Sequence, residues 1–125
     1  MLAMPEIIPL EIPNVITVAD GKDKYLAEYP GELKAVGGSI TTLGTGAGTS
    51  TDIMISNGAT DMLSTIGSFE VDSATNLMEG QVVDDTVAAF AAGDVLEADC
   101  DAICGGADSE EVHIKLHVVL FIDDL

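Results

Sequence analysis

Residues 111–122 read Glu-Val-His-Ile-Lys-Leu-His-Val-Val-Leu-Phe-Ile, and this stretch decides the fold class. Every second residue from Val112 onward is aliphatic. The residues between the first four of them are polar: His113, Lys115 and His117. A period of two is typical of a β-strand that turns one face to the core and the other to solvent. The stretch therefore predicts a strand and not a helix.

The end of the same stretch is apolar on both faces, because Val119 and Phe121 take the positions that polar residues hold earlier. A strand that is apolar on both faces needs a cover on each side, and in a small domain we expect the second cover to be another subunit. Val119 and Phe121 are therefore predicted to contact a neighbouring subunit.

Shorter strands and turns are predicted upstream. Residues 96–102 alternate small or apolar residues with acids, which predicts a strand with Cys100 turned inward and the acidic side chains of Glu97, Asp99 and Asp101 turned outward. Asn57-Gly58 predicts a tight hairpin, and Asp20-Gly21 and Pro30-Gly31 predict further turns. With roughly eight or nine short strands and no amphipathic helix, the predicted fold is all-β, a single-domain antiparallel β-sandwich or jelly roll.

The first 14 residues have a different pattern, with three of the four prolines spaced by four residues. Proline at this spacing excludes a helix and favours an extended chain. We therefore predict an extended arm over residues 1–14 and a sandwich domain over residues 15–125. An apolar arm is expected to lie on its own domain or on another subunit, and a frayed tail is the alternative. The predicted contact residues of the arm are Pro5, Ile7, Ile8, Pro9, Leu10, Ile12 and Pro13.

The composition favours a folded, strongly acidic protein. The 125 residues suit one domain, and 47 % hydrophobic residues with a mean hydropathy of +0.37 are enough for a core. Four Lys and Arg against 22 Asp and Glu give a net charge of −18. Nucleic acid and anionic membranes are not expected partners, because both are bound through basic patches. The sequence has no signal-peptide pattern, which predicts that the protein is made and assembled in the cytoplasm of the cell that produces it.

No residue pattern points to catalysis. Cys100 and Cys104 lack the spacing of a zinc site and are expected to be free or packing thiols. His113 and His117 would lie about 13 Å apart on a strand, too far for one ion. The Gly- and Thr-rich residues 41–50 lack the Lys-Ser/Thr of a phosphate loop. We predict no enzyme, cofactor or metal site, and the acids between residues 94 and 111 leave open a Ca²⁺ or Mg²⁺ ion between subunits.

The order of several motifs resembles small β-sandwich virion proteins of tailed bacteriophages. The motifs are Ile16-Thr17-Val18-Ala19-Asp20-Gly21-Lys22, Tyr29-Pro30-Gly31-Glu32-Leu33, residues 44–55 (Gly-Thr-Gly-Ala-Gly-Thr-Ser-Thr-Asp-Ile-Met-Ile), Asn57-Gly58 and Ala91-Ala92-Gly93-Asp94-Val95-Leu96. The resemblance covers residues 14 to 122 and rests on turns, not on active-site residues. The proline-spaced arm and the apolar C-terminal end are not part of the shared pattern.

This resemblance implies a structural function. The expected protein is a capsid decoration (cement) protein on the outer surface of a phage head, where it binds the major capsid protein as a homotrimer. In that arrangement the arm would contact the capsid, and Val119 and Phe121 would contact the next subunit. The alternative is a receptor- or carbohydrate-binding domain of a head or tail fibre. Only five aromatic residues and no Trp weigh against a sugar site.

Overall fold

The computed structural model describes residues 1–72 and 75–123, and these residues form strands, turns and loops without a helix. The predicted end of the domain at residue 125 lies outside them. Within the described part, no helix is long and apolar enough to cross a membrane. The strands are β1 (Leu2–Val15), β2 (Ala19–Leu26), β3 (Gly31–Thr42), β4 (Ser50–Asn57), β5 (Thr60–Asp61), β6 (Leu63–Thr65), β7 (Gly67–Glu70), β8 (Val82–Val83), β9 (Ala89–Phe90), β10 (Val95–Ala102) and β11 (Glu110–Ile122).

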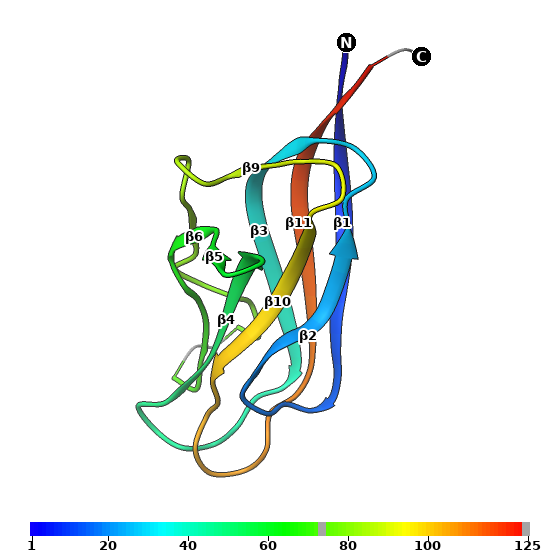
Figure 1. Cartoon of the computed structure of the whole chain (residues 1–125). Helices are drawn as coiled ribbons and strands as arrows, with labels where there is room; N and C mark the ends of the chain where they lie inside the picture. Colours follow the sequence, from blue (N-terminus) through cyan, green and yellow to red (C-terminus); the bar gives the residue numbers. More distant parts are fainter. Residues whose placement is uncertain (73–74, 124–125) are drawn as a thin grey trace.

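Two antiparallel sheets face each other and form the two layers of the molecule (Figure 1). Sheet A has the strand order β1-β11-β3-β9. Sheet B has the order β2-β10-β4, and both β5 and β7 pair with β4. The short strands β6 and β8 pair separately. Along the chain, β1 to β4 alternate between the sheets, β7 stays in sheet B beside β4, and β9, β10 and β11 alternate again. This is the connection pattern of a jelly roll built from two Greek keys. The predicted fold class is confirmed.

The core lies between the two sheets and follows the alternation of the sequence. In β11 every second residue from Val112 to Ile122 is buried, as the period of two predicts. Sheet B contributes Ile53 and Ile55 from β4 and Leu96 from β10. Other large side chains with less than 2 % exposure are Phe69, Leu33, Met62, Ile114 and Leu116. One continuous core therefore holds both layers together.

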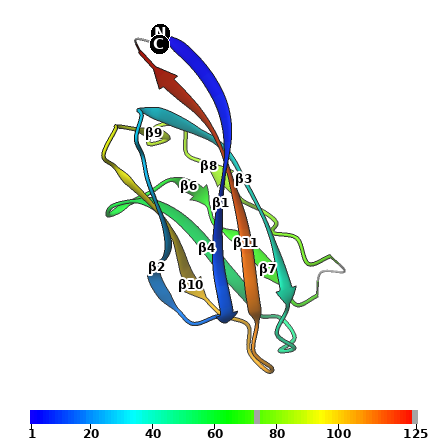
Figure 2. The ribbon, with the colours of Figure 1, turned by 90° about the vertical axis from the view of Figure 1, so that its right-hand side faces the viewer.

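Residues 2–15 form the edge strand β1 of sheet A and not a separate arm. β1 pairs antiparallel with β11 along its length, and the two strands rise together toward the end where both termini lie (Figure 2). The extended conformation agrees with the prolines, but the predicted boundary at residue 14 separates nothing. Ile8, Leu10 and Ile12 were predicted to contact a capsid and are instead buried in the core of the same chain.

The prolines fit this strand because their backbone nitrogens face away from the neighbouring strand. In an antiparallel pair the N–H groups of alternate residues face the neighbouring strand, and the others face away. The N–H of Glu11 faces away from β11, because it donates to Asp23 Oδ2 at 2.8 Å. Pro5 and Pro9 share this outward parity, so the ladder loses no donor. Pro13 stands at the bulge before Val15.

The predicted turns are only partly correct. Asn57-Gly58 closes the hairpin between β4 and β5, with φ of +59° at Gly58. Pro30-Gly31 begins β3 after a turn, as predicted. Asp20-Gly21 lies inside β2, where Gly21 has a φ of +62° at a point of shifted register against β10. A left-handed glycine serves a bulge as well as a turn, and the sequence pattern does not separate the two.

Candidate functional site

The outer face of sheet A is the candidate functional site. We define it as the side chains that sheet A turns away from the core. They are Pro5, Ile7, Pro9 and Glu11 of β1, His113, Lys115, His117, Val119 and Phe121 of β11, and Glu32, Lys34, Gly37 and Ser39 of β3. β1 and β3 flank β11 on its two sides, so the three strands make one continuous surface.

A shallow hollow of about 650 Å³ lies on the half of the outer face nearer the termini. It is lined by Pro5, Glu6 and Ile7 of β1, by His117, Val118 and Val119 of β11, and by Lys34 of β3. Ile7 is 54 % exposed, which is high for an isoleucine side chain in a strand. The hollow is therefore an apolar depression that the chain itself leaves uncovered.

A second hollow of about 290 Å³ lies further along β11. Its lining combines Gly37 and Ser39 of β3 with His113 and Lys115 of β11, and Leu77 closes one side. An added Cβ at Gly37 would meet nothing within 4 Å, so the glycine leaves open space at this point. The two hollows follow the central strand one after the other.

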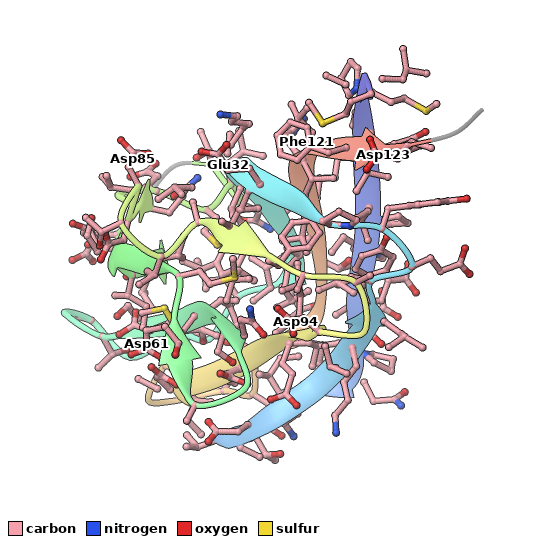
Figure 3. All side chains as sticks on the ribbon, turned by 45° about the horizontal axis from the view of Figure 1, so that its top comes forward. Glu32, Asp61, Asp85, Asp94, Phe121 and Asp123 are labelled. Atoms are coloured by element: carbon pink, nitrogen blue, oxygen red, sulfur yellow. The ribbon has the colours of Figure 1, made fainter. Side chains whose placement is uncertain are left out.

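The outer face is neutral on a strongly acidic chain. It holds two lysines, Lys34 and Lys115, and two glutamates, Glu11 and Glu32, so its formal charges cancel, whereas the whole chain carries −18. Both histidines of the chain also lie here. Asp61, Asp85 and Asp94 lie apart from one another and away from Phe121, whereas Asp123 lies beside Phe121 at the end of β11 (Figure 3). The middle of this face, around Lys115, therefore repels another acidic protein less than the rest of the surface does.

The free edge of β1 is poorly suited to accept another strand. Pro5 and Pro9 remove two of the outward N–H donors, and Asp23 already accepts the N–H of Glu11. Prolines at an edge are a common protection against edge-to-edge pairing. A partner on this side is therefore expected to pack against the outer face and not to extend the sheet.

Asp99 was predicted to point outward with Glu97 and Asp101, but its side chain is only 5 % exposed. Its Oδ1 accepts the N–H of Gly21 at 2.7 Å, and its Oδ2 accepts the hydroxyl of Ser56 at 2.7 Å. β10 shifts its register against β2 and β4 near this residue, and the strict alternation ends there. Asp99 therefore ties three strands together and is not a surface acid.

Thr51 of β4 and two residues of the loop between β10 and β11, Cys104 and Ser109, form a second buried polar group. Thr51 Oγ1 accepts the N–H of Cys104 at 3.1 Å and lies 3.2 Å from Ser109 Oγ. Cys100 and Cys104 are both free and buried, and burial raises the pKa of Cys100 to about 11. A neutral thiol is a weak nucleophile. The group around Thr51 holds the loop between β10 and β11 against β4.

The acids do not form an evident cation site. Asp101 has an elevated pKa because it is partly buried and lies near the carboxylates of Asp99, Asp61, Asp20 and Asp52. Among residues 1–72 and 75–123, no three His, Cys, Asp or Glu side chains are arranged to hold a metal ion. The acids of sheet B therefore repel one another across the surface.

The structure sorts the predicted contact residues into two groups. Pro5, Ile7, Pro9, Val119 and Phe121 lie on the outer face, with the first three on β1 beside the last two on β11. The residues predicted to contact a capsid and those predicted to contact a subunit therefore share one surface. Sequence reasoning missed Lys34 and the hollow at Gly37, because only the pairing of β3 with β11 brings them there. The chain matches no family model, no curated protein and no solved structure in the three comparisons made.

Proposed function

We propose that this chain is a structural protein that attaches to a protein shell through the outer face, as a decoration protein on the outside of a phage head. The observation that carries the proposal is a neutral, partly apolar face with two uncovered hollows on a chain of charge −18. Jelly rolls occur in viral capsid proteins and lectins, but a fold alone does not establish function. The surface therefore supports the proposal more directly than the topology does.

The proposed partner is the major capsid protein, and the proposed gain is mechanical. Burial of apolar surface contributes about 25 cal/mol per Å², so one such contact is modest. Because many copies bind one shell, their modest contacts add up and increase the mechanical resistance of the whole particle. The homotrimer expected from the sequence stays a prediction, with Val119 and Phe121 now on the same face as the proposed shell contact.

The test is cosedimentation of the purified chain with empty, expanded shells of the major capsid protein from the genome that encodes it. Ile7→Asp places a charge in the first hollow and is expected to weaken binding at least about tenfold, since a buried unpaired charge is costly. Val18→Asp is the matched control, because Val18 is 57 % exposed and lies in the connection between β1 and β2, outside both hollows.

The control variant is expected to bind within about twofold of the unchanged chain, as surface substitutions usually have small effects. Circular dichroism melting of both variants checks that they fold. No cosedimentation of the unchanged chain would reject the proposal, and equal binding by Ile7→Asp would reject the role of the outer face.

A further inference from the structure

We infer that the shell surface seated on the outer face presents carboxylates to Lys115 and His117, an inference that rests on the proposed function. Lys115 stands in the middle of the outer face on the central strand β11, with His117 two residues further on. Lys115 lines the second hollow and His117 lines the first. Lys115 and His117 therefore mark the border between the hollows.

The other cationic side chains already have partners within the chain. Lys24 lies 3.6 Å from Glu97, and Lys34 lies 3.3 Å from Glu32. His113 Nδ1 lies 2.9 Å from Glu11 Oε1, and the ammonium of Lys22 donates to Thr17. In contrast, Lys115 and His117 form no ion pair or side-chain hydrogen bond with any residue in the described ranges 1–72 and 75–123.

This lack of partners is unusual for a chain with 22 carboxylates and four lysines. Intramolecular pairing is the easy outcome when acids outnumber bases so strongly. An exposed, unpaired lysine between two apolar hollows is suited to a partner that brings its own carboxylate. Apolar side chains of the same partner would fill the hollow at Ile7 and Val119.

A second copy of the chain fits this surface less well. Two identical outer faces packed about a twofold axis through their centres would bring Lys115 close to Lys115 of the copy. Like charges at such close range oppose association. Addition of a strand at β1 is hindered by the prolines. The occupant argued for here is therefore an acidic, partly apolar patch on the shell.

The experiment measures cosedimentation with the same shells for three lysine variants. Lys115→Glu is expected to weaken binding at least about tenfold, because it replaces an attraction with a repulsion. Lys115→Arg keeps the charge and is expected to bind within about twofold of the unchanged chain. Lys22→Glu changes the net charge of the chain equally but lies on β2, outside the outer face, and is also expected to bind within about twofold.

Each other outcome overturns a distinct statement. Equal weakening by Lys115→Glu and Lys22→Glu would show that only the total charge of the chain matters. Full binding by Lys115→Glu would show that Lys115 has no carboxylate partner on the shell. Either result rejects the inference and leaves the proposed function standing. Absence of binding by the unchanged chain rejects the proposed function itself. Sedimentation velocity of the chain alone then measures whether it forms a dimer. A dimer that Lys115→Glu dissociates would make a second copy the occupant and reject the inference.

Discussion

Gly44 shows how single residues hold the base of this sandwich together. The loop after β3 and the loop before β11 meet there, at the end opposite the termini (Figure 1). The N–H of Gly44 donates to Ser109 Oγ at 2.9 Å, and the N–H of Gly46 donates to the carbonyl of Gly105 at 2.8 Å. Thr45 Oγ1 accepts the N–H of Ala107 at 3.0 Å. The Gly- and Thr-rich stretch thus binds the loop before β11 through hydrogen bonds.

Gly44→Ala is expected to destabilise the fold. A Cβ at this position would lie 2.5 Å from Cys104 Cβ and 2.7 Å from the carbonyl oxygen of Ala107, so backbone must shift. Overpacking of this kind costs about 1–3 kcal/mol in the free energy of unfolding, measured by urea denaturation. Gly37→Ala is the control, since its Cβ meets nothing within 4 Å, and we expect a change between zero and a gain of about 1 kcal/mol. Equal effects of the two substitutions would contradict the loop contact.

At the scale of the element, β1 combines two roles on its two faces. Ile8, Leu10 and Ile12 fill the core. Ile7 and Pro9, whose side chains point to the opposite side of the strand, are exposed on the outer face. The strand is therefore part of the fold and part of the candidate site at once. Deletion of residues 1–13 would remove core side chains as well as the surface, so loss of binding by such a truncation would carry no information about contacts.

Point substitutions separate the two faces of β1. Leu10→Ala removes a side chain that is only 2 % exposed and is expected to lower the free energy of unfolding by about 2–5 kcal/mol. Ile7→Ala on the opposite face is expected to change it by no more than about 0.5 kcal/mol. Urea denaturation of both variants measures this difference. Comparable losses would show that Ile7 also packs against the domain.

Much of the fold could be predicted from the sequence, because alternation and turn residues act locally. The strands β10 and β11 and the Asn57-Gly58 hairpin follow from such patterns. The position of β1 could not be predicted, since prolines every four residues suit an edge strand as well as an arm. Asp99 escaped prediction because a register shift breaks the period of two. The outer face depends on β1, β11 and β3 being neighbours, and such long-range pairing has no local signal.

At the scale of the whole molecule, charge is distributed unevenly between the two layers. The outer face of sheet A is neutral, whereas carboxylates from β2, β4, β5 and β10 surround Asp101 in sheet B. Repulsion among like charges destabilises a compact state. The electrostatic repulsion therefore falls mainly on sheet B, around Asp101.

Asp101→Asn is expected to raise the melting temperature at pH 7. Partial burial and nearby carboxylates raise the pKa of Asp101, so the folded chain holds this proton more tightly than the unfolded chain. Its contribution to stability therefore falls as the pH rises from the ordinary value of 3.8 through the raised pKa. The gain at pH 7 is expected to stay below about 1 kcal/mol, because the side chain is largely exposed and screened.

The same gain should vanish in melting curves recorded below about pH 2.8, one unit under the ordinary value of 3.8, where Asp101 is largely protonated in both states. Asp85→Asn changes the net charge equally at a position apart from Asp61 and is the control (Figure 3). A pH-independent gain, or an equal gain in the control, would show that the local carboxylates are not the cause.

The pairing of β1 with β11 also sets an order of events during synthesis. Leu2 pairs with Ile122, so β1 leaves the ribosome well before its partner β11, and sheet A cannot close until β11 has been made. Contacts so distant in sequence form slowly, and an apolar strand left unpaired is exposed to other nascent chains. Pro5 and Pro9 cost the finished sheet no hydrogen bond, yet they hinder such wrong pairings throughout the wait. The same prolines that make this strand look like a loose arm in the sequence are therefore expected to protect it from wrong pairing before β11 is available.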